Sequence, residues 1–303
     1  MQPLRVNIFN TSSNLPLLAA QEAGCFARRG LALEIQHTPN SDAQRSGLVA
    51  GSFDIAHAAV DNAVAMVEAG QDVVIVLGGD AGMNEFMVRE EIGSIADLRG
   101  KVLAVDAPNT AYALVAKKIL KNHGLLEGRD YTVRLAGGTG PRAAAMVADP
   151  QLAAGMINPP FSFTVRQQGL KSLGNQYTLL GPYQATGAFV LRSWAQAHAD
   201  VLQQYLAACI EGHRLVMDPS HRPQMIELLM RSFKLDSAAA TGTYEALLTP
   251  GAGLAPDARF NTEGFQTVLA IRAEMEGMWG GIPPAPARYI DLSYAERATR
   301  TIS

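Results

Sequence analysis

The stretch RVNIFNTSSNLPLLAAQEAGCFARRGLALEI, residues 5–35, contains a complete strand, polar loop, helix and second strand. Residues 5–9 alternate polar and apolar side chains, which is the pattern of a half-buried strand. Pro16 suits the first turn of a helix, and Gly30 suits its end. Residues 31–35 then predict a second strand, parallel to the first because a helix separates the two. The stretch therefore predicts an α/β fold.

The loop at residues 10–14, NTSSN, carries only amide and hydroxyl side chains. In open α/β sheets, small ligands bind beyond the carboxyl ends of the strands, and this loop follows such an end. Its polar groups have two interpretations: contact with a ligand, or capping of the helix that follows. The residues concerned are Asn10, Thr11, Ser12 and Asn14.

Composition limits the classes of function. The chain has 303 residues, of which 48% are hydrophobic and 17% are charged, so it is globular and long enough for two domains. A net charge of −3 offers no basic field for nucleic acid or an anionic membrane. No apolar run is long enough to span a membrane. Cys25 and Cys209 are predicted to be buried free thiols on helices, with a disulfide between them as the alternative.

Strand and helix signals alternate along the first two thirds of the chain. The strands are predicted at 53–58, 73–77, 85–89, 101–106, 131–135, 154–157 and 187–191, and the last third is mostly helical. The pattern restarts at residue 101, which indicates a second sheet. We predict a first lobe at residues 1–91 and 184–303 and an inserted second lobe at 92–183, joined by two crossings that form a hinge.

Two residues near the strand at 53–58 are candidates in the first lobe. Asp61 is placed to cap a helix over residues 62–69, or alternatively to accept a hydrogen bond from a ligand. His57 is either a packed core histidine or a ligand contact.

The second lobe offers a helix start and a cation. Asn109 and Thr110 open a helix whose free N–H groups suit an anionic ligand, although capping alone would explain Asn109. Tyr112 adds a flat face for a planar ligand, or packs between the lobes. Arg142 directly follows the loop GGTGP, which includes Thr139, and its positive charge in the first turn of a helix opposes the helix dipole. The charge either binds an anionic ligand or is exposed to solvent.

Asn158 and Phe161 end the strand at 154–157 and complete this ring of strand-end residues. The pair Pro159-Pro160 fixes the turn between them. The loop GGTGPR lacks the lysine and hydroxyl of a phosphate-binding Walker loop and the spacing of a dinucleotide-binding one. The sequence has no nucleophile elbow and no metal-ligand spacing, so no cofactor and no metal are predicted.

The ordered set LPLLAAQEAGCFARRGLALEI, LVAGSFDIAHA, IGSIADLRGKVLAVDAPNTAYALVAKKIL and GMINPPF resembles the solute-binding proteins of ABC transporters in the alkanesulfonate, nitrate and thiamine-pyrimidine group. The resemblance covers about the first two thirds of the chain. It departs from the group at Cys25, which replaces an aromatic residue, and at Asn158 and Pro159, which stand where tryptophan and glutamate are usual.

The resemblance implies a two-lobed type II periplasmic-binding-protein fold, in which each lobe is a mostly parallel sheet flanked by helices and the ligand lies in a cleft between the lobes. It implies a monomeric receptor that captures a planar or anionic molecule, such as a sulfonate, carboxylate or pyrimidine, and delivers it to an ABC permease. That function places the protein in the periplasm. Because the first strand begins near Leu4, the sequence leaves no room for a signal peptide, and we expect that one has been removed.

An enzyme on the same fold is the alternative, resembling thiamine-pyrimidine synthases or small aromatic-acid decarboxylases, and it would be cytoplasmic. His37 and His57, near strand ends, support this alternative. The cysteine-rich motif of the synthases is missing, which speaks against it.

Overall fold

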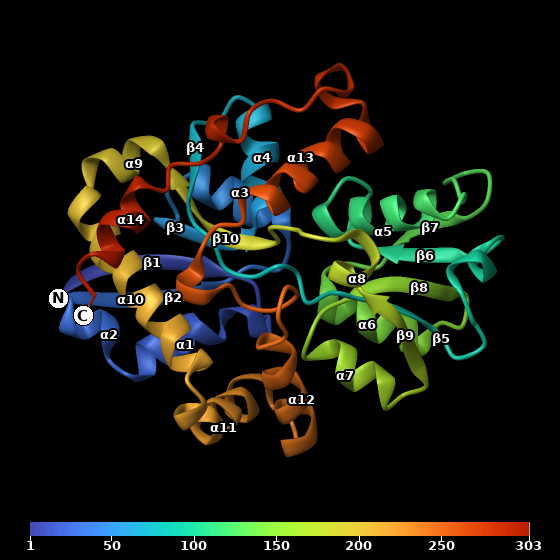
Figure 1. Ribbon diagram of the computed structural model, residues 1–303, viewed down its shortest axis with the longest axis horizontal. Helices are drawn as coiled ribbons and strands as arrows, with labels where there is room; N and C mark the ends of the chain where they lie inside the picture. The colour runs from blue at the N-terminus through green and yellow to red at the C-terminus, as the bar shows by residue number, and fades with distance from the viewer. Residues whose placement is uncertain (303) are drawn as a thin grey trace. The chain divides into compact units, whose positions relative to one another are not determined.

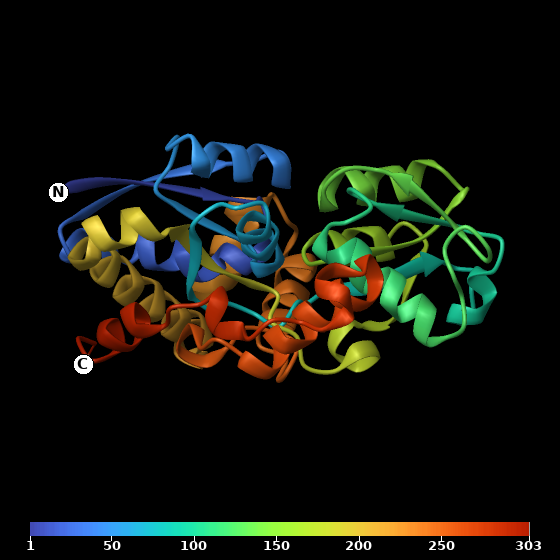
Figure 2. The same cartoon turned by 90° about the horizontal axis from the view of Figure 1, so that it is seen from above.

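Two five-stranded sheets, each with helices on both faces, make up the fold in the computed structural model (Figures 1 and 2). The structure describes residues 1–302. Unit 1 comprises residues 1–81, 184–262 and 285 onward, and unit 2 comprises residues 82–183 and 263–284. Strand β1 and helix α14, from opposite ends of the chain, therefore belong to the same unit.

The sheet of unit 1 has the strand order β2-β1-β3-β10-β4. Its strands are β1 (Gln2–Ile8), β2 (Leu31–His37), β3 (Ile55–Ala59), β4 (Val73–Leu77) and β10 (Thr186–Leu191). Strand β1 pairs in parallel with β2 and β3, whereas β10 is antiparallel to both β3 and β4. Strands β1 to β4 therefore point the same way, and the loops that follow them share one edge.

Helices of unit 1 include α1 (Leu15–Glu22), α2 (Cys25–Arg28), α3 (Ser41–Val49), α4 (Val60–Glu68), α9 (Arg192–Ala197), α10 (Ala199–Met217), α11 (Arg222–Phe233), α12 (Ser237–Leu247) and α14 (Ser293–Thr299). The single helix expected after residue 14 is split in two, because Gly24 adopts a φ of 72° that ends α1. Asn40 caps α3 by accepting a hydrogen bond from the Ala43 N–H.

Helices α1 and α10 pack so closely in the core of unit 1 that one position requires glycine. A Cβ built on Gly212 would lie 2.1 Å from the carbonyl oxygen of Pro16. Cys25 and Cys209 lie in the same core as buried free thiols, which confirms the prediction. Burial raises the pKa of the Cys209 thiol to about 12, so this group is inert at neutral pH.

The sheet of unit 2 has the strand order β7-β6-β8-β5-β9. Its strands are β5 (Glu85–Arg89), β6 (Val102–Val105), β7 (Thr132–Leu135), β8 (Leu152–Ile157) and β9 (Leu170–Asn175). Strand β6 is parallel to β7 and β8, and β5 is antiparallel to β8 and β9. The edge strand β9, which the sequence analysis does not predict, has an irregular, half-exposed side-chain pattern.

Helices of unit 2 are α5 (Ala111–Asn122), α6 (Thr139–Ala148), α7 (Phe161–Arg166), α8 (Gln176–Leu180) and α13 (Thr262–Glu276), with a one-turn helix η2 (Ile95–Leu98) before β6. The loop predicted at 137–141 is shorter than expected, because α6 already begins at Thr139. Ser94 and Asp97 form a capping box at the start of η2.

The units differ from the predicted lobes at two places. Residues 82–91 belong to unit 2, because β5 pairs with β8 and β9 of that unit. Residues 263–284 also belong to unit 2, because Glu274 of α13 forms ion pairs with Lys118 (2.6 Å) and Lys121 (2.9 Å) of α5. The chain consequently crosses between the units four times rather than twice.

No helix among residues 1–302 is both long enough and apolar enough to cross a lipid bilayer.

Candidate functional site

The loop after β1 is tied to the strand that precedes it. The Asn14 side-chain amide donates to the Phe9 carbonyl at 2.7 Å, and the hydroxyls of Thr11 and Ser13 are hydrogen-bonded at 2.8 Å. Ser12 is fully buried in a short 3-10 helix (Ser12–Asn14), whereas Asn10 is exposed. Much of the polarity of this loop therefore serves its own conformation. Ligand contact by Asn10, Thr11, Ser12 and Asn14 stays a prediction.

His57 lies within β3, two residues before the end of that strand. Its Nε2 is hydrogen-bonded to the hydroxyl of Tyr205 on α10 at 2.7 Å. Burial, together with nearby His213, lowers the pKa of His57 to about 4, so the ring is neutral near pH 7. This hydrogen bond agrees with a packed core histidine, one of the two interpretations drawn from the sequence. Ligand contact by His57 stays a prediction.

Asp61 does not cap α4, contrary to the sequence-based expectation. The helix begins one residue earlier, at Val60, and Ala59 is its N-cap. Asp61 instead lies in the first turn of α4, 3% exposed, where a carboxylate interacts favourably with the helix dipole. Its contact with a ligand stays a prediction.

In unit 2 the loop after β6 leads directly into α5. Thr110 is the N-cap residue of α5, and its hydroxyl donates to the carboxylate of Asp106. The Asn109 side chain is exposed, while its carbonyl accepts a hydrogen bond from Arg272 of α13 at 3.3 Å. Tyr112 lies in the first turn of α5 and is half-buried. These residues place a helix N-terminus at the carboxyl edge of the sheet.

Arg142 is the buried cation of that same edge, 2% exposed. Its guanidinium donates to the carbonyl of Met156 from Nε (3.1 Å) and Nη2 (2.9 Å), and to the carbonyl of Gly137 from Nη1 (2.7 Å). Nη2 also contacts the Thr139 hydroxyl at 3.4 Å. Arg142 thus fastens the end of β8 to the start of α6, a role that the sequence does not reveal.

The charge of Arg142 is partly balanced. Burial lowers the pKa of the guanidinium, and the neighbouring Asp106 carboxylate and Tyr112 act in the opposite direction. Residues from two loops, after β6 and after β7, therefore gather around Arg142. Asp106 was not predicted as a site residue, although it stands at the strand end that the sequence indicates.

Asn158 and Phe161 follow β8, the strand next to β6. Asn158 is 7% exposed, and its carbonyl accepts a hydrogen bond from the Ser162 N–H at 3.2 Å. The ring of Phe161 lies against α6, since a Cβ built on Gly140 would be 3.1 Å from it. Phe161 therefore packs α7 on α6.

Polar groups that the sequence analysis missed lie beside Asn158. Strand β5 places Asn84 next to the ends of β8 and β9, and the Asn84 carbonyl accepts from the N–H of Gln176 at 2.8 Å. The side chains of Asn84, Gln176 and Ser162 are fully buried. Several polar side-chain atoms here have no hydrogen-bond partner among the residues that the structure describes. They are the amide nitrogen and oxygen of Asn84, the amide nitrogen and oxygen of Gln176, Asn158 Oδ1 and Ser162 Oγ. We call these four residues the amide cluster.

Each unit thus gathers its predicted residues at the carboxyl edge of its own sheet. Within the described part of the chain, no group of three His, Cys, Asp or Glu side chains is arranged to hold a metal ion. The predicted position of the ligand, between the lobes, stays a prediction.

Two α/β units joined by several crossings, each with polar loops at one sheet edge, define the two-lobed periplasmic-binding-protein class of fold. The family model "NMT1/THI5 like" matches residues 11–219, more than half of the chain. The chain belongs to this family, and the resemblance drawn from the sequence is confirmed. No curated protein sequence matches the chain.

Solved structures show the same fold at low sequence identity. The ligand-binding component of an ABC-type import system from Staphylococcus aureus, with zinc bound, has a TM-score of 0.83 at 14% identity over 99% of this chain and 100% of that chain. The nitrate-binding protein NrtA from Synechocystis PCC 6803 has a TM-score of 0.81 at 14% identity over 100% of this chain and 89% of that chain. The alkanesulfonate-binding protein SsuA from Xanthomonas axonopodis pv. citri, bound to MOPS, has a TM-score of 0.77 at 20% identity over 96% and 98% of the respective chains. The predicted fold class is confirmed.

Proposed function

We propose that this chain is the solute-binding receptor of an ABC importer and that it binds a small organic molecule without changing it. The family and the fold support this function, since the similar structures named above include components of such importers. The observation that carries the proposal is the carboxyl edge of unit 2. There the start of α5 and the amide cluster provide donors and acceptors along one edge of the sheet, at which the buried charge of Arg142 also lies.

The amide cluster narrows the class of ligand. Its carbonyl oxygens, Asn84 Oδ1, Asn158 Oδ1 and Gln176 Oε1, require N–H or O–H donors. A simple sulfonate or carboxylate offers acceptors only, and would suit the helix start at Thr110 instead. A planar molecule that carries both amino groups and acceptors, such as an aminopyrimidine, would satisfy both kinds of group once the cluster's side chains turn toward it.

The proposal includes partners and location. The receptor acts as a monomer in the periplasm and presents its loaded form to a membrane permease. Candidate ligand contacts are those predicted from the sequence, together with Asn84 and Gln176.

Thermal unfolding with a ligand panel tests this function. A ligand that binds only the folded chain adds roughly 2.7 kcal/mol to the free energy of unfolding at 100 times its dissociation constant. We expect 4-aminopyrimidine or a substituted relative to raise the melting temperature more than methanesulfonate or acetate. If no member of the panel shifts the transition, the receptor function is contradicted.

A matched pair of variants locates the site. Tyr112→Ala removes a flat face at the start of α5 and is expected to weaken binding about tenfold, the equivalent of about 1.4 kcal/mol. Tyr177→Ala removes an equally large ring that is 39% exposed on α8 of the same unit, and is expected to leave affinity unchanged. Equal effects of the two substitutions would place the ligand elsewhere.

The enzyme alternative is tested by turnover. His57, one of the histidines that suggested it, is bonded to Tyr205 and is neutral near pH 7. A receptor returns its ligand unchanged with both the native chain and His57→Ala, whereas an enzyme that uses His57 loses its turnover in the variant.

A further inference from the structure

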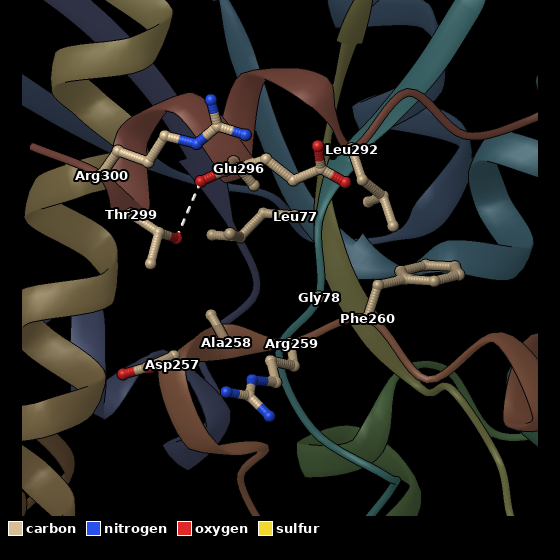
Figure 3. A pocket seen from close by; sticks show the side chains of 11 residues that line it. Leu77, Gly78, Asp257, Ala258, Arg259, Phe260, Leu292, Glu296, Thr299 and Arg300 are labelled. Carbon is tan, nitrogen blue, oxygen red and sulfur yellow. Dashed lines mark hydrogen bonds between the residues drawn. The ribbon is translucent and has the colours of Figure 1, made fainter.

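A cavity of about 630 Å³ lies wholly within unit 1 (Figure 3). It is bordered by the end of β4, the segment around the 3-10 helix η4 (Pro256–Ala258), and α14. All of its lining residues are described, and none of them is among the site residues predicted from the sequence. Its volume is in the range of pockets that bind small organic molecules.

The middle of the cavity is apolar. Leu77 is 2% exposed and Ala258 is 1% exposed, so both present fixed surfaces. Phe260, Leu292 and Ala295 extend this lining, and Figure 3 shows the Phe260 ring and Leu292 on one side of the opening. An apolar molecular body would lose its contact with water here, which favours binding by about 25 cal/mol for each Å² buried.

The charges at the cavity are uneven. Asp257 is already paired with Arg214, Nε to Oδ1 at 2.8 Å. Glu296 and Arg300 bring one negative and one positive charge to the α14 side of the cavity. Arg259 forms no ion pair with any side chain from Met1 to Ile302, and Figure 3 places its guanidinium across the cavity from Glu296 and Arg300. The Arg259 charge helps to lower the pKa of the nearby Asp257 carboxyl, but the ion pair of that carboxyl is with Arg214. The Arg259 guanidinium can therefore accept an anionic partner from the cavity.

The segment that bears Arg259 is held in place by the sheet. The Gly78 N–H donates to the Ala258 carbonyl at 3.1 Å. A Cβ built on Gly78 would lie 2.4 Å from the Arg259 carbonyl oxygen, so only glycine permits this approach. His213 of α10 donates from Nδ1 to the Ala255 carbonyl at 3.2 Å. The cavity is thus preformed, which reduces the entropic cost of binding.

We propose that this cavity is a second ligand site, which binds a small organic monoanion with an apolar body. The body lies against Leu77, Ala258 and Phe260, and the anionic head contacts Arg259. A medium-chain or aromatic carboxylate has this chemistry. The site lies within one unit and does not depend on the receptor function proposed above.

Octanoate is a suitable probe, with octan-1-ol as its uncharged counterpart. Isothermal titration with the full chain is expected to show saturable octanoate binding with a dissociation constant below about 1 mM. Octanoate is expected to bind at least about fivefold more tightly than octan-1-ol, because only the carboxylate forms a charge-assisted hydrogen bond with an arginine.

Variants assign the binding to this cavity. Arg259→Gln, an exposed position, is expected to lower octanoate affinity about fivefold and to remove the preference over octan-1-ol. Arg297→Gln is the matched control, because Arg297 stacks on Tyr294 of the same helix and does not line the cavity. Ala295→Trp fills the cavity from α14 and is expected to abolish binding of both probes.

Absence of saturable octanoate binding would overturn the proposal. The proposal would also be overturned if Arg259→Gln and Arg297→Gln weakened octanoate binding equally. Circular dichroism checks that Ala295→Trp is folded. If it is not folded, the octanoate affinity of Arg259→Gln alone tests whether the ligand binds in this cavity. The ligand panel described above tests the strand-end site separately, so failure of one site does not imply failure of the other.

Discussion

Burial determines the protonation of two histidines in unit 1. The pKa values of His57 and His213 are both lowered to about 4 from an ordinary value of 6.5, chiefly by desolvation. Between pH 4 and 6.5 the unfolded chain therefore binds more protons than the folded chain. The free energy of unfolding must rise with pH across this window, and the stability that it represents is lost as the pH falls.

A histidine substitution measures this effect. His213→Gln is expected to reduce the slope of unfolding free energy against pH, by at most about 1.4 kcal/mol per pH unit, because one buried titrating group is removed. Urea unfolding at several pH values between 4.5 and 7 provides the slope. His37→Gln, at an exposed histidine that ends β2, is the control and is expected to leave the slope unchanged. Equal slopes in all three proteins would contradict the assignment.

One substitution in the amide cluster is expected to have opposite effects on the stability of the protein and on its affinity for the ligand. Asn84→Leu is expected to leave the free energy of unfolding unchanged or to raise it by about 1 kcal/mol, because both polar atoms of Asn84 are buried without partners in the described structure. The same change is expected to weaken ligand binding. Chemical denaturation and a binding titration measure the two effects.

Asn175→Leu is the matched control for that prediction. Its Oδ1 accepts from the Thr178 N–H at 2.8 Å and caps α8, so its loss is expected to cost about 1 kcal/mol. A destabilisation by Asn84→Leu as large as that of the control would mean that the Asn84 amide is satisfied.

Sequence reasoning locates some site residues but not their contacts. Polar residues after predicted strands, such as Thr110 and Asn158, do lie at the expected sheet edge. The burial of Arg142 against the Met156 carbonyl depends on the pairing of β6 with β8, which a local pattern does not contain. Asn84 and Gln176 were missed for the same reason, since antiparallel pairing of β5 brings them beside Asn158.

Among the elements, strands with a continuous apolar run were the easiest to predict. Strand β4, VVIVL, has the predicted bounds because its residues are all buried. Strand β9, LKSLGN, was missed because most of its side chains are half-exposed at a sheet edge. Helix α13 was predicted, but its unit was not, because an amphipathic pattern does not specify the sheet that it covers.

Helix packing around Gly212 gives the prediction at this scale. Gly212→Ala is expected to destabilise the protein by about 1–3 kcal/mol, because the added Cβ would lie 2.1 Å from the Pro16 carbonyl and would push α1 and α10 apart. The intrinsic preference of helices predicts the opposite sign, a gain of up to about 1 kcal/mol for alanine over glycine. Thermal or urea unfolding decides between them.

The control lies on the same helix. Gln203→Ala changes a half-buried side chain of α10 and is expected to alter stability by less than about 0.5 kcal/mol. Stabilisation of the protein by Gly212→Ala would show that the two helices are not in close contact at this residue.

At the scale of the whole molecule, the two units divide the chain at other residues than the predicted lobes do, for a reason that lies in strand pairing. Alternating strands and helices reveal where a new sheet begins, near residue 101. They do not reveal that the strand before it, β5, inserts antiparallel into that new sheet. Each sheet contains one such antiparallel strand, β10 in unit 1 and β5 in unit 2, next to a crossing of the chain between the units.

The exposed surface leads to a prediction of oligomeric state. Among residues 1–302, the large apolar side chains that lie exposed are Met1, Val49, Leu126, Leu135, Tyr177 and Ile282. They come from separate elements of both units, so they lack the contiguous apolar area that stable dimers bury. We expect sedimentation velocity to give a single species of 32.3 kDa at micromolar concentration, with and without ligand. A concentration-dependent doubling of the mass would contradict a receptor that acts as a monomer, and would require that polar rather than apolar surfaces hold the two copies together.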